Sequence, residues 1–198
     1  MLAAATPTGL RRGLGPAAAW LLGGLLLAIY GLYTLVTRDL VIARLMLFGL
    51  IVGFGELPAD AFGVTTTRTL VYWPGGPFIW DTPLYMPLSW VTVVAQLGFI
   101  GAFLVPRWGA RRAAIAMAIF GGINIPIYEF LAKFAHFWYY QNTPLLFGVT
   151  PYYVILAEAL LSMSLPLLAY KAISAQSGQV VVLGLVGAAA AIATLGNG

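Results

Sequence analysis

The sequence predicts an all-α integral membrane protein: one bundle of about six transmembrane helices, with two aromatic-rich loops capping one end. Composition is the first reason, because 61% of the residues are hydrophobic and only 8% are charged, whereas soluble domains contain about 25% charged residues. Length is the second, since 198 residues suit five to seven spans of roughly 20 apolar residues each. We expect one domain over 1–198, and no internal repeat is evident from the sequence.

The first two spans follow a short polar N-terminal segment, 1–15. The apolar run 16–36 is longer than the apolar core of a signal peptide, so we interpret it as a membrane span. Thr37, Arg38 and Asp39 form a turn, and the second span covers about 40–57.

A long loop, 58–82, comes next and contains the aromatic- and proline-rich segment 72–83. Proline has no backbone donor and a fixed φ, so this segment cannot be a regular helix. Irregular backbone near a bilayer is tolerated where protein or a watery cavity satisfies its polar groups. We therefore expect the loop to cover a functional site.

The rest of the chain contains four further apolar runs. They predict spans at about 83–105, 113–131, 150–170 and 179–195, and a second aromatic loop at 132–149 separates the middle two.

The basic residues predict the orientation, because cytoplasmic loops carry an excess of Lys and Arg. In the six-span arrangement one side carries Arg38, Arg44, Arg107, Arg111, Arg112 and Lys171, and the other carries Arg11, Arg12, Arg68 and Lys133. The first side is then cytoplasmic and both termini lie outside. We expect a multi-pass protein of the bacterial inner membrane.

Five of the six acidic residues fall near the opposite membrane face: Glu56, Asp60, Asp81, Glu129 and Glu158. Ionisable groups inside a membrane are costly and usually face the bundle interior. We therefore take Glu56, Asp81, Glu129 and Glu158 as candidate catalytic residues.

Each acid also has a structural explanation. Asp81 could cap the third span, and Glu129 could pair with Lys133 one helical turn away. Glu56 and Asp60 could mark a hydrated helix end. Glu158 is the hardest to explain in this way, because it is the deepest and has no basic neighbour in the sequence.

Aromatic and polar side chains near these acids are the candidate substrate-binding residues: Trp73, Trp80, Trp90, Trp138, Tyr139, Asp60, Asn124 and His136. The rings could simply form the aromatic belt of a membrane protein. Alternatively, their π faces could stabilise a carbocation made by a buried, protonated carboxyl. Because the chain has no cysteine and one histidine, we expect no metal site and no cofactor.

Segment 56–160 resembles integral-membrane carotenoid biosynthesis proteins, which include the bacterioruberin-type carotenoid hydratases. Gly55-Glu56, the helix start Pro83-Leu84-Tyr85-Met86-Pro87-Leu88-Ser89-Trp90, the stretch His136–Tyr140 and the loop Phe147–Pro151 carry the resemblance. The family's Asp-Pro is missing, and Glu129 is the nearest substitute. In its layout the chain is also similar to membrane-bound terpene cyclases.

These observations predict a membrane enzyme of isoprenoid metabolism, which cyclises or hydrates a C=C bond or epoxide of an apolar substrate without a metal. Asp81 or Glu56 would be the general acid, and Glu158 or Glu129 would accept the final proton or position water. Its partners would be the isoprenoid or lipid substrate and membrane lipids, with no nucleic acid. The alternative is a non-catalytic lipid- or pigment-binding subunit, or a small transporter component.

Overall fold

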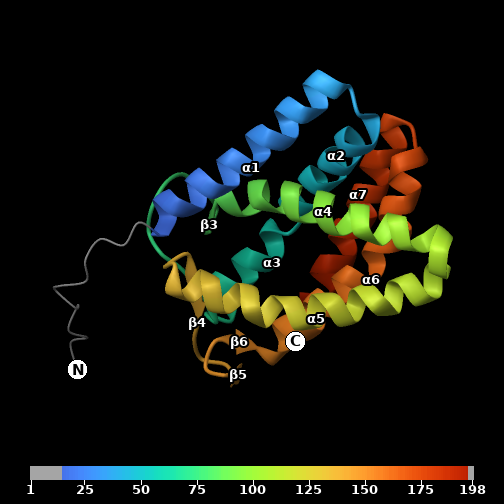
Figure 1. Ribbon diagram of the computed structural model, residues 1–198. Helices are drawn as coiled ribbons and strands as arrows, with labels where there is room; N and C mark the ends of the chain where they lie inside the picture. Colours follow the sequence, from blue (N-terminus) through green and yellow to red (C-terminus); the bar gives the residue numbers. More distant parts are fainter. Residues whose placement is uncertain (1–14, 196–198) are drawn as a thin grey trace, which may run out of the picture.

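The computed structural model describes residues 15–195 and is a helical membrane bundle, as the sequence predicts (Figure 1). Arg11 and Arg12, used above for orientation, lie outside the described residues. The long helices are α1 (Gly15–Thr37), α2 (Leu40–Gly55), α4 (Tyr85–Trp108), α5 (Ala110–Phe134), α6 (Tyr152–Ser174) and α7 (Ser177–Leu195). Four of them, α1, α4, α5 and α6, are long and apolar enough to cross a membrane, and so is the helical path Leu40–Thr66 that begins with α2. Among the described residues, the apolar stretch of α7 covers Gly178–Ala189.

Short, well-defined turns connect the helices at one end of the bundle. Between α1 and α2, the Asp39 side chain accepts hydrogen bonds from the backbone N–H groups of Val41 and Ile42, at 2.9 and 3.2 Å. Such a cap satisfies donors that have no partner inside the helix. Between α4 and α5 the turn is the single residue Gly109, whose φ of 77° suits glycine best.

The helical path that starts in α2 continues beyond the loop boundary that we expected at residue 58. A short helix, α3 (Leu57–Ala61), and a π-helical turn, η1 (Phe62–Thr66), follow α2 directly. Pro58 permits this because it occupies the first turn of α3, where its missing N–H would lack a helical partner in any case. The loop is therefore shorter than predicted, and Asp60 is held on a helix.

The two aromatic loops meet at the other end of the bundle and form short antiparallel ribbons. The strands are β1 (Leu70–Tyr72) with β4 (Trp138–Tyr140), β2 (Phe78–Ile79) with β3 (Thr82–Pro83), and β5 (Leu145–Leu146) with β6 (Thr150–Pro151). In the β1–β4 ribbon Val71 lies opposite Tyr139. Segments far apart in the chain thus join into one cap.

The order of elements repeats, which the sequence alone did not reveal. Residues 40–108 form a helix, a strand, a hairpin and a second helix, and residues 110–174 form the same series. Both hairpins end in a buried Thr-Pro pair, Thr82-Pro83 and Thr150-Pro151, 68 residues apart. We call these segments the first and second repeats.

Hydrogen bonds across the β1–β4 ribbon confirm this correspondence. Trp73 N–H donates to the Phe137 carbonyl at 3.2 Å, and Gln141 N–H donates to the Thr69 carbonyl at 2.9 Å. Adding 68 to either residue of the first repeat gives its counterpart in the second, so the two bonds are related by a pseudo-twofold axis. That axis passes through the Val71–Tyr139 pair at the centre of the ribbon.

Helix packing follows the same pseudo-symmetry. In the first repeat α2 packs on α4, and in the second α5 packs on α6; α4 and α6 meet between them. Gly53 and Gly121 occupy equivalent positions on α2 and α5 and permit the close helix contacts. Because both repeats start at the same end of the bundle, they are parallel repeats, with their axis along the bundle.

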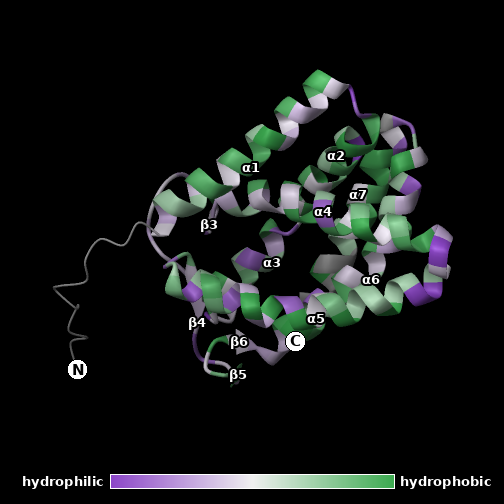
Figure 2. Ribbon diagram, viewed as in Figure 1, coloured by the Kyte–Doolittle hydropathy of each residue, from purple (hydrophilic) through white to green (hydrophobic). Residues whose placement is uncertain are grey.

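Charge separates the two ends of the bundle, and hydrophilic residues concentrate at the helix ends (Figure 2). The end opposite the ribbons carries Arg38, Arg44, Arg107, Arg111, Arg112 and Lys171, as the sequence predicts. Within residues 15–195 the only Lys and Arg residues at the ribbon end are Arg68 and Lys133.

Candidate functional site

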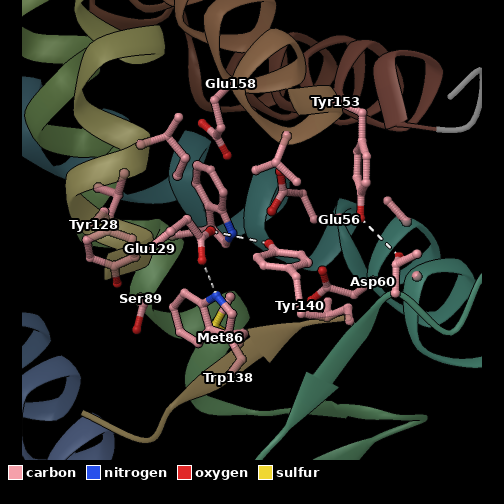
Figure 3. Close-up of a pocket in the computed structure, with 18 of the residues that line it drawn as sticks. Glu56, Asp60, Met86, Ser89, Tyr128, Glu129, Trp138, Tyr140, Tyr153 and Glu158 are labelled. Atoms are coloured by element: carbon pink, nitrogen blue, oxygen red, sulfur yellow. Dashed lines mark hydrogen bonds between the residues drawn. The ribbon is translucent and has the colours of Figure 1, made fainter. Parts of the chain in front are cut away.

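A cavity of about 310 Å³ lies between the two repeats and is closed on one side by the β1–β4 ribbon (Figure 3). Most of its wall is apolar, with Met86, Trp90, Val93, Leu97, Ile125 and Val154 among the lining residues. Four carboxyl groups also line it: Glu56, Asp60, Glu129 and Glu158. An apolar cavity with a few convergent polar groups is the usual form of a small-molecule site.

The four carboxyl groups come from four different helices. Glu56 ends α2, Asp60 lies on α3, Glu129 lies near the end of α5, and Glu158 lies in the first third of α6. Glu56 and Glu129 are buried, with 7% and 4% of their surface exposed. Only the packing of both repeats brings these acids to one space.

Asp60 is held by a tyrosine of the ribbon. The Tyr72 hydroxyl donates a hydrogen bond to Asp60 Oδ2 at 2.7 Å. Burial, and to a smaller extent the charge of Asp60, raises the pKa of Tyr72 well above its usual value. The phenol therefore stays protonated and remains a donor.

Glu129 is held by two donors from strand β4. Trp138 Nε1 donates to Oε2 at 2.6 Å, and the Tyr140 hydroxyl donates to Oε1 at 3.2 Å. Burial, followed by the charge of Glu129, raises the pKa of Tyr140 well above its usual value. Alternate side chains of a strand point to opposite faces, so Trp138 and Tyr140 face the cavity and Tyr139 does not.

Glu158 differs from Asp60 and Glu129. Its carboxyl group points into the cavity from α6 (Figure 3). Among the residues that the structure describes, none donates a hydrogen bond to its side chain, whereas Asp60 accepts one and Glu129 accepts two. Glu56 lies close enough to interact electrostatically with Glu158, and it also neighbours Trp90.

Three of the four candidate catalytic acids therefore line one cavity: Glu56, Glu129 and Glu158. The fourth, Asp81, lies elsewhere. With Trp80 it forms the exposed tip of the β2–β3 hairpin, in a separate surface depression that Arg68 also lines. A two-residue hairpin tip extends away from the helices, which explains why Asp81 does not reach the acids of the cavity.

The candidate substrate-binding residues divide in the same way. Asp60, Trp90, Asn124 and Trp138 line the cavity, and Trp80 is 66% exposed at the hairpin tip. Trp73, His136 and Tyr139 form a separate cluster: the Trp73 ring lies 5.1 Å from the His136 ring and 5.9 Å from the Tyr139 ring, between centroids. None of these three lines the cavity.

Sequence reasoning missed several polar residues of the wall: Tyr72, Ser89, Tyr128, Tyr140, Tyr153 and Ser162. Tyr153 shares a hydrogen bond of 3.0 Å with the Thr69 hydroxyl. One signal was present in the sequence, because Trp138 and Tyr140 alternate as one face of a strand. Within residues 15–195, no three His, Asp or Glu side chains are grouped closely enough to hold a metal ion.

Comparison with protein-family models assigns the chain to a family. Residues 57–196 match the model of a family described as Domain of unknown function (DUF6989). The chain belongs to the DUF6989 family. The DUF6989 match covers the whole second repeat and most of the first, so it includes every cavity carboxyl except Glu56. No curated protein and no solved structure matches the chain.

Proposed function

We propose that this DUF6989 protein is a membrane enzyme of isoprenoid metabolism that cyclises or hydrates its substrate by protonating a C=C bond or an epoxide. The observation that carries the proposal is one apolar cavity lined by four carboxyl groups and several aromatic rings. Its volume of about 310 Å³ is at the lower end of the range for ligand cavities. It suits a short isoprenoid or the end of a long one.

The proposed reaction begins with proton transfer from a carboxylic acid to an alkene carbon. The O–H electron pair stays on the carboxylate, and the π electrons form the new C–H bond, which leaves a carbocation. Aromatic faces stabilise such a cation, and Trp90, Tyr128 and Trp138 line the cavity. A second C=C bond or a water molecule then captures the cation, and loss of a proton to a carboxylate gives the cyclised or hydrated product.

The resemblance of segment 56–160 to carotenoid hydratases and, more loosely, to membrane-bound terpene cyclases supports the same reaction class. Both groups act on apolar isoprenoids. The reaction needs no metal or other cofactor, and we include that independence in the proposal.

The test is to express the protein in cells that make linear polyprenes and in cells that do not. Apolar molecules extracted with the detergent-purified protein are then identified by mass spectrometry. The proposal predicts a polyprene isomer, or a polyprene heavier by one water, in the first host only. We expect Glu56→Gln, Glu129→Gln and Glu158→Gln to reduce its yield at least 10-fold, in line with general acid–base catalysis.

Asp81→Asn is the matched control. It removes an acid that lies outside the cavity, and we expect it to leave the yield unchanged. An unaltered lipid or pigment, bound stoichiometrically by wild type and by all four variants, would contradict the proposal and favour a non-catalytic binding subunit.

A further inference from the structure

The cavity lies on the pseudo-twofold axis between the repeats, so many of its lining residues occur as counterparts 68 residues apart. The pairs that differ in chemistry are Glu56 with Asn124, Asp60 with Tyr128, and Trp90 with Glu158. In each pair a carboxyl group in one repeat corresponds to an amide or an aromatic ring in the other. The two halves of the cavity have therefore diverged in chemistry on a shared backbone.

The pair Tyr72 and Tyr140 has not diverged. Each tyrosine lies on a strand of the central ribbon and donates a hydrogen bond to an acid of its own repeat, Asp60 or Glu129. The tyrosines thus hold two of the four carboxyl groups in fixed positions, although the acids themselves are not counterparts, since Glu129 corresponds to Ala61. The role of the tyrosine as a donor is shared by both repeats.

The pair Trp90 and Glu158 differs most. Gly53 on α2 approaches α4 so closely that an added Cβ would lie 2.8 Å from Trp90 Cβ, and Gly121 on α5 approaches α6 so closely that it would lie 2.9 Å from the Glu158 carbonyl oxygen. Trp90 and Glu158 therefore both lie where a glycine of the neighbouring helix comes close, although the near atom is Trp90 Cβ in the first repeat and the Glu158 backbone oxygen in the second. Their side chains differ: one is an indole and the other is a carboxyl group.

Glu158 also differs from the acids that the tyrosines hold. Within residues 15–195 its side chain accepts no hydrogen bond, and it points into a mostly apolar cavity. An unpaired charge is very costly in apolar surroundings, so such a group is normally neutral. A neutral carboxyl group that faces the cavity, with its O–H not used to hold other residues, can give its proton to a substrate.

We propose that Glu158 is the proton donor of the reaction and that Trp90, its counterpart in the first repeat, is the ring that faces the resulting cation. This inference rests on the proposed function and names its acid. The Glu158 O–H bond breaks as a C–H bond forms on the substrate, and the carboxylate of Glu158 faces a carbocation bordered by Trp90. The proton released when the product forms restores the acid.

Dicyclohexylcarbodiimide tests the state of Glu158 without any substrate. This apolar reagent adds to protonated carboxylic acids and gives a stable N-acylurea. We expect one adduct per chain in the purified full-length protein at neutral pH, located on Glu158 by peptide mass spectrometry. Glu158→Gln should abolish the adduct and Glu158→Asp should keep it, whereas Glu129→Gln and Asp60→Asn should still be labelled.

An adduct on Glu56 in place of Glu158, or no adduct at all, would overturn the inference. Gel filtration and thermal unfolding in detergent identify any variant that fails to fold. If Glu158→Gln does not fold, labelling of Glu158→Asp still tests the inference.

Product yield in the polyprene-producing host tests Trp90. Trp90→Phe keeps an aromatic face and should retain most of the yield, whereas Trp90→Leu should lose roughly 30-fold, the value of a desolvated cation–π contact. Neither substitution should change the labelling of Glu158. Equal yields from Trp90→Leu and wild type would overturn the part of the inference that concerns Trp90.

The two proposals fail in different ways. Product from wild type and from Glu158→Gln in equal amounts would overturn the assignment of Glu158 and leave the proposed reaction standing. If Glu158 is labelled but no product forms in any host, the proposed reaction is overturned, and so is the role of Glu158 as its proton donor.

Discussion

The indole Nε1 of Trp138 donates a hydrogen bond to Glu129 Oε2 at 2.6 Å, and both residues are almost fully buried. Their chain separation is nine residues, and the end of α5 and the turn before β4 lie between them. The bond therefore fixes the cavity-facing carboxyl to the ribbon that closes the cavity.

Removing this donor should destabilise the protein measurably. Trp138→Phe leaves a buried Glu129 oxygen without its closest donor, and we expect the free energy of unfolding to fall by about 1–3 kcal/mol. Thermal unfolding in detergent, followed by circular dichroism, measures the change. Tyr139→Phe is the control, because its side chain is on the other face of the ribbon; equal losses from the two substitutions would contradict this description of the site.

Substitution by alanine should affect the stability of the protein differently at two neighbouring glycines of α5. A Cβ on Gly121 would lie 2.6 Å from Ser162 Cβ, whereas one on Gly122 would lie 3.5 Å from Ala159 Cβ. Gly121→Ala should therefore cost about 1–3 kcal/mol by overpacking, and Gly122→Ala should be neutral or stabilise the helix by up to about 1 kcal/mol. Melting curves in detergent distinguish the two.

Gly53→Ala tests whether the repeats are equivalent. Its added Cβ would lie 2.8 Å from Trp90 Cβ, so its melting temperature should fall about as much as that of Gly121→Ala. A harmless Gly53→Ala beside a damaging Gly121→Ala would argue against equivalent helix packing in the two repeats.

The distribution of charge predicts that the ribbon end of the bundle lies on the outer side of the membrane. Since the chain has no cysteine, single cysteines at two exposed tryptophans report the orientation. Trp80 lies on a hairpin at the ribbon end and is 66% exposed, and Trp108 lies at the opposite, arginine-rich end and is 51% exposed. The two variants are Trp80→Cys and Trp108→Cys. A membrane-impermeant maleimide added to intact cells should label only Trp80→Cys, and the reverse pattern would invert the topology.

Alkaline pH should weaken the ribbon through its two tyrosines. Burial raises the pKa of Tyr72 and of Tyr140 well above 10, the value in the unfolded chain. The folded state keeps these protons where the unfolded state loses them, so the contribution of the two tyrosines to the free energy of unfolding is constant below about pH 10 and falls as the pH rises further. Melting temperatures between pH 8 and 11 measure the slope, and the Tyr72→Phe/Tyr140→Phe double variant should show a shallower decline than wild type.

Much of the fold follows from the sequence, because membrane spans are a local property of composition. The expected spans at 16–36, 83–105 and 113–131 correspond to α1, α4 and α5. One boundary was wrong: the path of α2 continues past Pro58 to Thr66. A proline ends a helix or begins one according to its place in the turn, and composition does not specify that place.

The internal repeat could not be recognised from the sequence. Apolar residues replace one another freely in lipid-facing helices, so few identical residues remain at the offset of 68. The repeat becomes visible through backbone features, such as the paired strands and the two buried Thr-Pro hairpin ends.

The sequence by itself determined that this is a helical membrane protein with unusual acids and aromatic rings near one end. Only the tertiary structure decided that Glu56, Glu129 and Glu158 share a cavity, that Asp81 does not, and which faces of the ribbon the rings occupy. The reason is physical. Hydrophobicity and turn chemistry act within a few residues, whereas the meeting of side chains depends on helix rotation and on strand register between segments about 70 residues apart.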